Sequence, residues 1–430
     1  MTSPSLKHSV LALVNARIFT AVDSRIIENG VVVVRDGIIH DVGTSGYVEV
    51  PGEAEVLDLK GSFLMPGLIE AHAHLSGCKS ADFVKEPLVT PYEVLLLRAA
   101  KDLEVLINAG YTTFVDPASV IALKLKYAVN EGTINGPRIV ASGPPLTQTF
   151  GHGDIHYLPV EWVDVRTTKK LVSPFASLIC DGIEECRKAA RYALREGADF
   201  IKIMASGGVL SQRDKPEYRQ FTVEEIKAIV EEARAVETFV YAHTYSSIGI
   251  KNAIQGGVKV IAHASFIDEE GIVLAREKDA IVVPTTATYY KILTEGAKAG
   301  FPEWGLRKAE EVFKVHCENI RKAYKSGVKI AAGSDFIGGP FRHGENALEL
   351  KMLVERIGMS PAEALIAATR IAAEVAGLLD RVGTIEKGKL ADIIAIRGNP
   401  LDNIDTLLNV NNIVLVMKEG EILKRDKSFY

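Results

Sequence analysis

The two ends of the chain share a pattern of hydrophobic and polar positions that the middle lacks. From Val10 to Leu57, β-branched residues alternate with polar ones between glycine-containing turns, as in VVVVRDGIIHDVG. A period of two is typical of antiparallel strands. The same pattern returns after Val382 in GTIEKGKLADIIAIRG and NNIVLVMKEGEILKRD. We therefore expect residues 1–62 and 378–430 to form one small β-sandwich from the two chain ends.

The middle of the chain alternates short apolar strands with helical stretches such as TVEEIKAIVEEARAV. Strands are expected in LMPGLIEAHAHL at 64–75 and at residues 112–117, 138–143, 199–206, 239–244, 259–265, 280–284 and 329–335. Eight strands with intervening helices are typical of a (β/α)8 TIM barrel rather than an open doubly wound sheet. The first strand is followed by no phosphate loop or dinucleotide fingerprint, which also disfavours a nucleotide-binding sheet. We expect an α/β fold in which residues 63–377 form this barrel.

Several of these strands follow the same glycine-containing signal. It occurs in INAGYTTFVD, REGADFIKI, IQGGVKVIAH and YKSGVKIAAG. Glycine readily adopts the left-handed conformation that ends a helix before the chain turns into a strand. The repeat therefore supports the order of the barrel independently of any candidate site residue.

Charge and composition indicate which kinds of molecule the protein is expected to bind. The 430 residues carry a formal net charge of −5, 47% of them are hydrophobic, and no long run has one sign of charge. A nucleic-acid track or a polybasic membrane patch is therefore not expected, and a small or neutral partner fits better. The N-terminus lacks the three regions of a signal peptide, and no segment has the ~18 apolar residues of a transmembrane helix. We expect a cytoplasmic protein.

Cysteine usage indicates the same compartment. The four cysteines lack the paired spacing of a zinc knuckle or a disulfide framework. They are Cys78, Cys180, Cys186 and Cys317. We expect reduced thiols.

Histidines and an aspartate recur where predicted strands end. His72 and His74 are two residues apart, so they share one face of a strand, although such a pair alone is more often two core histidines. His243 ends FVYAH, His263 ends KVIAH and Asp335 ends KIAAGSD. In a TIM barrel, catalytic groups converge at these carboxyl ends of the strands. Imidazole and carboxylate groups bind Zn²⁺ and similar divalent ions, so the pattern indicates a metal site.

Lys202 is an unusual residue for the middle of the predicted strand DFIKIMAS. A buried ammonium ion is costly unless it is paired or loses its charge. Burial readily makes a lysine amine neutral, and a neutral amine can add carbon dioxide to form an anionic carbamate between two cations. The alternative is a lysine that pairs with a buried carboxylate such as Asp199 or Asp116.

In their order along the chain, PGLIEAHAHL, FIKI, YAHT, IAHAS, AAGSD and GTIEKGKLADIIAI resemble the amidohydrolase superfamily, in its binuclear branch with a carboxylated lysine. The resemblance covers essentially the whole chain. It implies two divalent metal ions, with zinc expected, and carbon dioxide bound as a Lys202 carbamate that bridges them. The implied ligands are His72, His74, Lys202, His243, His263 and Asp335. Glu70 departs from the pattern, since many relatives have aspartate there.

Further segments resemble the branch of prolidase-like and arginine-type metallo-carboxypeptidases, with imidazolonepropionase as a more distant relative. They are TQTFGHGD, ASGGVLSQRDKPEYRQFTVEE and HTY. The resemblance implies that His152 and Tyr245 contact the substrate carbonyl, while a structural His152 and a Tyr245 that only packs stay open. It also implies a homo-oligomer.

Other candidates for substrate binding are weaker. A free carboxylate would favour an arginine that forms a bidentate hydrogen bond. Arg219, Arg342 and His343 are the candidates, with Arg213 slightly less favoured than Arg219, and a solvated loop arginine is the alternative for either of these two. The remaining histidines have no strand-end placement and are expected to be structural or exposed: His8, His40, His156 and His316.

The expected reaction is hydrolysis of an amide bond. Two cations about 3.5 to 4 Å apart make hydroxide available near neutral pH from a bridging water. Asp335 is expected to act as general base and then acid, and His152 and Tyr245 are expected at the developing oxyanion. The expected substrate is a dipeptide or an N-acyl amino acid, as for a prolidase or carboxypeptidase.

Other functions stay open. The same hydroxide would attack a cyclic amide, a lactone, a carbamate or an aryl amide, and the metal ligands do not separate these substrates. A mononuclear deaminase is disfavoured because it has no use for Lys202 as a bridge. A non-catalytic scaffold is disfavoured because all six expected ligands are present.

Overall fold

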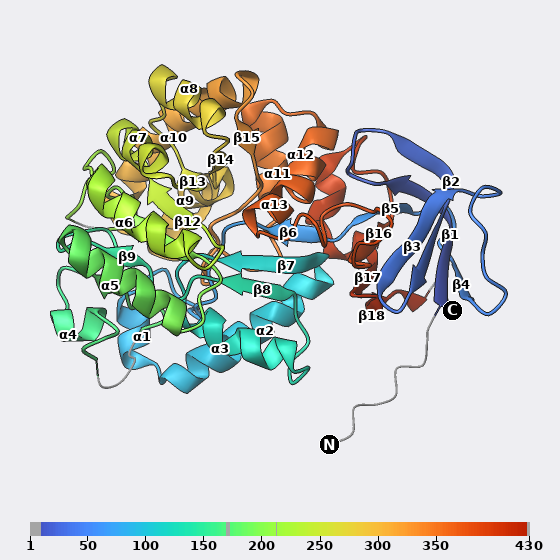
Figure 1. Ribbon diagram of the computed structural model, residues 1–430, viewed down its shortest axis with the longest axis horizontal. Coiled ribbons are helices and arrows are strands. Elements are labelled where there is room, and N and C mark those ends of the chain that lie inside the picture. The colour runs from blue at the N-terminus through green and yellow to red at the C-terminus, as the bar shows by residue number, and fades with distance from the viewer. Residues whose placement is uncertain (1–9, 169–172, 212, 428–430) are drawn as a thin grey trace.

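Figure 1 shows the computed structural model of the chain, which describes residues 10–168, 173–211 and 213–427. The strands are β1 (Val10–Phe19), β2 (Ile26–Arg35), β3 (Ile38–Thr44), β4 (Glu55–Asp58), β5 (Phe63–Pro66), β6 (Leu68–Glu70), β7 (Tyr111–Asp116), β8 (Arg138–Ala141), β9 (Leu146–Thr147), β10 (Leu178–Ile179), β11 (Ile201–Met204), β12 (Val240–Thr244), β13 (Val260–His263), β14 (Ile281–Val283), β15 (Lys329–Ile330), β16 (Ile393–Ile396), β17 (Ile413–Lys418) and β18 (Glu421–Arg425). The α-helices are α1 (Lys85–Val89), α2 (Tyr92–Asn108), α3 (Val120–Asn130), α4 (Val160–Val163), α5 (Gly182–Arg195), α6 (Val223–Arg234), α7 (Ser247–Gly256), α8 (Glu269–Glu277), α9 (Thr286–Ala299), α10 (Glu303–Lys325), α11 (Leu348–Met352), α12 (Pro361–Ala367) and α13 (Arg370–Val375).

Strands from both chain ends lie in one eight-stranded sheet. Its order is β18-β17-β16-β5-β1-β2-β3, with β4 beside β1. Strand β16 pairs antiparallel with β5 and so joins the two ends, which appear as blue and red strands at the right of Figure 1. The second layer that a sandwich requires stays a prediction, as do the domain boundaries after residues 62 and 377.

Two parallel sheets carry the middle of the chain. One has the order β6-β7-β8 and the other the order β10-β9-β11-β12-β13-β14-β15. Each of the eight predicted strands overlaps a strand of these sheets, which confirms an α/β fold with parallel strands. Strands β9 and β10 were not predicted, because two residues each are too few to show a periodicity.

Backbone hydrogen bonds join the edges of the two parallel sheets. The N–H of Asp199, before β11, donates to the carbonyl of Ala141 in β8 at 2.8 Å. The N–H of Ala71, after β6, donates to the carbonyl of Ala332, after β15, at 3.1 Å. Both contacts are ones that a closed barrel requires, and full closure stays a prediction.

Helices cover the parallel strands, and several end at the glycines that the repeated signal predicts. Helices α5, α6 and α7 pack side by side around the strands (Figure 1). Gly110, Gly197, Gly257 and Gly327 have φ between 87° and 96°. This is the left-handed conformation that costs glycine little, so the prediction of glycine caps is confirmed.

Cys180 and Cys186 form a disulfide, which corrects the expectation of four reduced thiols. Cys180 follows β10 and Cys186 lies near the start of α5, and their Cα atoms are 5.0 Å apart. The pairing was not predictable from spacing, because Cys180 is placed by the unpredicted strand β10. Cys78 and Cys317 are free.

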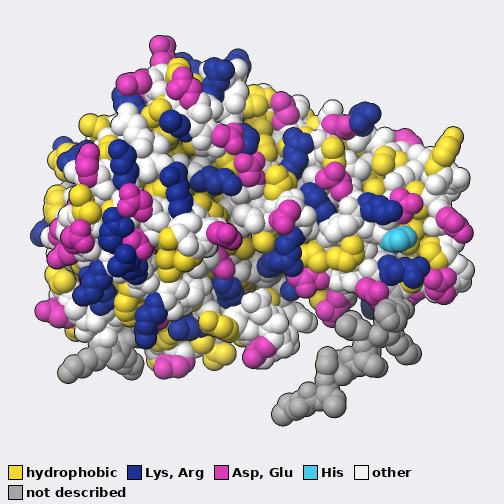
Figure 2. Space-filling view, viewed as in Figure 1, with side chains coloured by type: hydrophobic (Ala, Val, Ile, Leu, Met, Phe, Trp, Pro, Cys, Tyr) yellow, Lys and Arg dark blue, Asp and Glu magenta, His cyan; other side chains and the backbone are white. Residues whose placement is uncertain are grey.

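Charges of both signs are intermixed on the face in Figure 2. Some charged side chains of the described residues form ion pairs between neighbouring helices, such as those of Arg187 with Glu231 and Glu232. Solvent and salt screen such surface pairs, so they contribute little to stability. Among the helices that the structure describes, none is long and apolar enough to cross a membrane.

Candidate functional site

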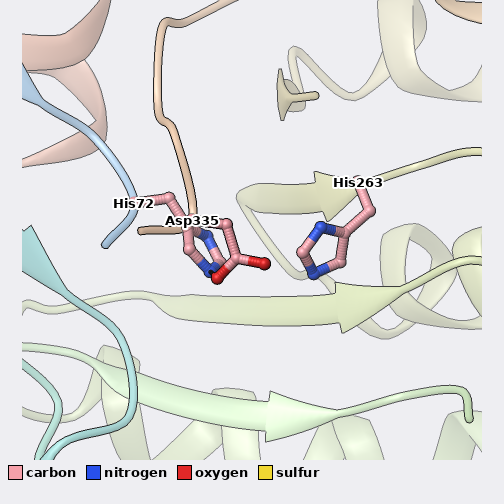
Figure 3. Close-up of side chains that lie close together, drawn as sticks. All are labelled: His72, His263 and Asp335. Atoms are coloured by element: carbon pink, nitrogen blue, oxygen red, sulfur yellow. Dashed lines mark ion pairs between the residues drawn. The ribbon is translucent and has the colours of Figure 1, made fainter. Parts of the chain in front are cut away.

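The first and last parallel strands bring two histidines and an aspartate together. Oδ1 of Asp335 lies 3.5 Å from Nε2 of His72 and 3.1 Å from Nε2 of His74. Ligand atoms of His72, His263 and Asp335 all lie within 4.8 Å of one another. Figure 3 shows the Asp335 carboxylate between the rings of His72 and His263. These residues form a candidate metal site.

Neighbouring groups aim Nε2 of the first-strand histidines at this site. The Tyr241 hydroxyl donates to the carbonyl of Ala71 at 3.2 Å, so it accepts from Nδ1 of His72 at 2.8 Å, since a phenol carries one proton. Nδ1 of His74 lies 3.4 Å from Asp116. Although burial acts to lower it, hydrogen bonds with carboxylates raise the pKa of His74 to about 9. A bound cation would therefore displace a proton from His74.

His243 and His263 face each other at the ends of β12 and β13. Nε2 of His263 lies 3.0 Å from Nδ1 of His243. Nε2 of His243 donates to the carbonyl of Gly207 at 3.2 Å, and Nδ1 of His263 lies 2.7 Å from Oγ1 of Thr285. Burial lowers the pKa of both rings, to about 3 for His263. Two neutral rings held in this way fit two ligands of one cation.

Lys202 is buried in β11 without a carboxylate partner. Its side chain is 1% exposed, and Nζ lies 4.7 Å from the ring centroid of Tyr241. Within the described residues it makes no ion pair, and Asp199 pairs with Lys126 at 2.5 Å instead. Burial lowers the pKa of Lys202 to about 7, although nearby carboxylates oppose this. The alternative of a Lys202–Asp199 ion pair is therefore wrong, and burial favours the neutral amine.

Asp116, the other partner considered for Lys202, binds the backbone of its own strand end. Its carboxylate accepts hydrogen bonds from three backbone N–H groups at 2.8 to 3.1 Å, those of Leu75, Ala118 and Ser119. It is fully buried. Asp116 therefore fixes the loop beside His74, and among the described residues it forms no ion pair with Lys202.

Glu70 connects the strand of the two histidines to the loop of Asp335. Its buried carboxylate accepts from the N–H of His72 at 3.0 Å and from the N–H and hydroxyl of Ser334 at 2.9 and 2.8 Å. It also accepts from Nδ2 of Asn346 at 2.8 Å. Burial raises the pKa of Glu70 to about 7, although these hydrogen bonds oppose it. The sequence left this residue unexplained, and the structure shows that it fixes the relative positions of His72 and Asp335.

Two of the site residues have a left-handed backbone. φ is 65° at His263 and 57° at Asp335. Such a conformation costs a non-glycine residue about 1 to 3 kcal/mol and is concentrated at functional sites. The N–H of Asp335 donates to the carbonyl of His72 at 2.6 Å, which helps to hold the strained position.

A pocket lies next to the cluster, and both His152 and Tyr245 line it. The His152 ring stacks on His243 with 4.2 Å between centroids, and the Tyr245 ring stacks on His263 at 4.8 Å. The apolar part of the lining is Phe83, Val84, Ala118, Pro145, Ile155, Tyr157, Phe175, Met204, Val209, Leu210 and Ile337. The two residues expected at a substrate carbonyl thus cover the two facing histidines.

The three weak candidates for substrate binding are not brought to this pocket. Within the described residues, its lining includes neither Arg219 nor Arg342, and both are exposed. Arg219 donates to the carbonyl of Phe221 at 3.3 Å. His343 is buried, and its Nε2 donates to the carbonyl of His74 at 3.1 Å. His343 therefore supports the backbone of a candidate ligand.

Sequence reasoning missed two residues of the site. His156 was expected to be structural or exposed, but it lines the pocket. Its place in the same GHGDIHY segment as His152 was the available signal. Tyr241, which bonds His72, lies two residues before His243, so strand periodicity puts both on one face. His40 is exposed, His316 is buried, and His8 lies outside the described residues.

Comparisons with known proteins agree with this geometry. Residues 63–423 match the amidohydrolase family. Ochratoxinase of Aspergillus niger is 34% identical over 98% of this chain and 88% of its own length. The imidazolonepropionase of Geobacillus sp. strain WCH70 is 25% identical over 93% of this chain and 91% of its own length.

Solved structures give the same result. The crystal structure of A. niger ochratoxinase has a TM-score of 0.89 at 33% identity and covers 98% of this chain and 97% of its own. A prolidase complexed with N-methylphosphonate-L-proline has a TM-score of 0.87 at 31% identity and covers 97% of this chain and 100% of its own. The chain therefore belongs to the amidohydrolase family and is a hydrolase that acts on C–N bonds.

Proposed function

We propose that the protein is a binuclear metal-dependent hydrolase that cleaves the amide bond of dipeptides or N-acyl amino acids. Its framework is a (β/α)8 barrel with a β-sandwich built from both chain ends. The observation that carries this proposal is the buried Lys202, which lacks a carboxylate partner beside four histidines with inward-facing nitrogens. A neutral amine there suits carbamate formation, which would place one negative charge and two ligand oxygens beside two cations.

The donor set fits two divalent ions, and zinc accepts both imidazole nitrogen and carboxylate oxygen. His72, His74 and Asp335 would hold one ion, His243 and His263 the other, and carboxylated Lys202 both. When bound, the pair would supply hydroxide near neutral pH and polarise the substrate carbonyl.

Asp335 is the proposed proton carrier. Burial alone would raise its pKa, but a hydrogen bond with His74 and the nearby positive charges lower it, so the carboxylate is ionised at neutral pH. It accepts a proton from the attacking water and delivers it to the leaving nitrogen.

Tyr245 and His152 are the proposed donors to the oxygen that becomes negative. Burial raises the pKa of Tyr245 well above its usual value, so its hydroxyl keeps the proton that it donates. Both side chains line the pocket over the facing histidines. Fixed donors at this position stabilise the developing charge.

The apolar lining favours substrates with apolar groups on either side of the amide bond. The similarity to an ochratoxinase and to a prolidase supports amide hydrolysis of a small molecule or dipeptide. We also propose that the protein forms a homo-oligomer and has no nucleic-acid or membrane partner.

An aryl-amide or carbamate hydrolase is the second candidate. It is favoured by one observation, that the described lining of the pocket contains no arginine for a free carboxylate. A cyclic amidase or lactonase would use the same site residues.

A matched substrate series tests the choice between these functions. Zinc-loaded enzyme is assayed on dipeptides and N-acyl amino acids, each with a free and an amidated α-carboxylate. We expect kcat/KM to fall about tenfold or more on amidation, because a bound carboxylate loses a charge-assisted hydrogen bond. Equal rates for both members would favour the aryl-amide or carbamate reading, and no hydrolysis of any amide would contradict both.

A further inference from the structure

His152 is held on its outer side by a loop that follows β11. Nδ1 of His152 lies 3.1 Å from Oδ2 of Asp214 and 3.1 Å from Oγ of Ser211. Among the described residues, every hydrogen bond of the ring uses Nδ1. A carboxylate only accepts, so Nδ1 donates to Asp214 and Nε2 remains for a substrate. Nε2 can donate to a substrate oxygen when the ring carries both protons.

Asp214 is an unusual residue for a loop because it is fully buried. Oδ2 also accepts from the N–H of Gly208 at 2.9 Å, whereas Oδ1 is buried without a hydrogen-bond partner in the described part of the chain. Burial alone would raise the pKa of Asp214, but the hydrogen bond with His152 is the main influence that lowers it. A buried carboxylate that keeps its charge for one histidine indicates a role connected to that histidine.

Lys308 of α10 fixes the same loop. Its Nζ donates to the carbonyls of Gly208, Ser211 and Asp214 at 3.2, 2.7 and 2.8 Å. These three bonds place a positive charge beside the buried carboxylate and hold the loop to a long helix.

Gly208 leaves room for the ring. A Cβ at this position would lie 2.1 Å from Cε1 of His152. Real Cβ contacts are never so short, so a side chain here would push aside the ring or the backbone of Gly208. The carboxylate of Asp214 and the missing side chain of Gly208 therefore both act on one ring position.

We propose that Asp214 is a positioning residue that holds the His152 ring with Nε2 toward the substrate carbonyl, and that Lys308 holds Asp214 in place. The inference rests on the amide hydrolysis proposed above. Asp214 does not touch the substrate itself and acts only through His152.

A double-mutant cycle tests this dependence. We expect Asp214→Ala to lower kcat about 10- to 100-fold with a much smaller change in KM, as for other groups that orient a functional histidine. If Asp214 acts through His152, adding Asp214→Ala to His152→Ala should lower kcat by no more than about twofold further. Losses that multiply in the double variant would overturn the proposal.

A second variant keeps the Asp214 side chain and adds a methyl group against the His152 ring. Gly208→Ala should lower kcat as Asp214→Ala does, while Gly52→Ala, where an added Cβ meets nothing within 4 Å, should leave it unchanged. Unaltered kcat in Gly208→Ala would count against a required ring position. Lys308→Met should lower kcat in the same direction with a smaller effect.

Crystal structures separate this inference from the proposed function. In Asp214→Ala we expect the His152 ring to leave its stacked position on His243, whereas in wild type and in Asp392→Ala it stays. Asp392 is the matched control, since it is also buried, lies directly before β16 and bonds Arg138 of β8. A wild-type enzyme that hydrolyses no amide would contradict the proposed function. A His152 ring that stays in place in Asp214→Ala would by itself overturn the positioning role.

Discussion

We expect Lys202→Ala to abolish amide hydrolysis and to leave the protein with at least one metal ion fewer. The expected loss of kcat/KM is about 10³-fold or more, because a catalytic metal ion contributes several kcal/mol to the transition state. The reason lies in the site, where Lys202 is buried, has no carboxylate partner and has a pKa of about 7. Zinc content and kcat/KM, measured on the same preparation, check this expectation.

Chemical rescue distinguishes a carbamate from a merely structural lysine. Alanine leaves space where a short carboxylic acid such as acetate or propionate can bind and supply the missing bridge. We expect such acids to restore part of both the metal content and the activity of Lys202→Ala. Lys202→Met, which fills the space with an uncharged chain of similar length, is the matched control and should not be rescued. Full activity of either variant without added acid would contradict the proposed Lys202 carbamate.

Asp335→Asn removes the proposed proton carrier with little change in size. We expect kcat to fall about 10²- to 10⁴-fold, the range of general acid–base catalysis, because an amide does not accept the proton. Oδ1 of Asp335 is 3.1 Å from His74, so metal content must be measured in the same samples. Substrates with better leaving groups should lose less, since they need less proton delivery.

The control for Asp335→Asn is Asp392→Asn, which alters a buried carboxylate directly before β16. It should lower the thermal stability while kcat of the folded enzyme stays constant. An Asp335→Asn enzyme that binds zinc normally and keeps wild-type kcat would show that another group carries the proton.

The eight parallel strands were predictable because apolar runs, helical stretches and the glycine caps repeat along the chain. The strand-end residues were predictable for the same reason, since parallel strands bring their carboxyl ends to one edge. Strands β9 and β10 were not, because each has two residues. The disulfide between Cys180 and Cys186 depends on β10 and was missed with it.

The hydrogen bonds that orient the histidines were not predictable from spacing, although strand periodicity places Tyr241 on the same face as His243. Tyr241 bonds His72 across 169 residues of sequence, and Asp214 bonds His152 across 62. Such contacts depend on how distant loops pack, and no local pattern encodes them. Arg219 and Arg342 lie outside the described pocket lining, because a loop position in sequence does not say whether a side chain faces the pocket or the solvent.

The number of metal ions per chain is the most direct test of the proposed binuclear site. The purified protein is stripped with a chelator, reconstituted with zinc and bicarbonate, and analysed for zinc per chain. The proposed binuclear site predicts two equivalents of zinc per chain, held by the histidines, Asp335 and carboxylated Lys202. Fewer than one equivalent would contradict it.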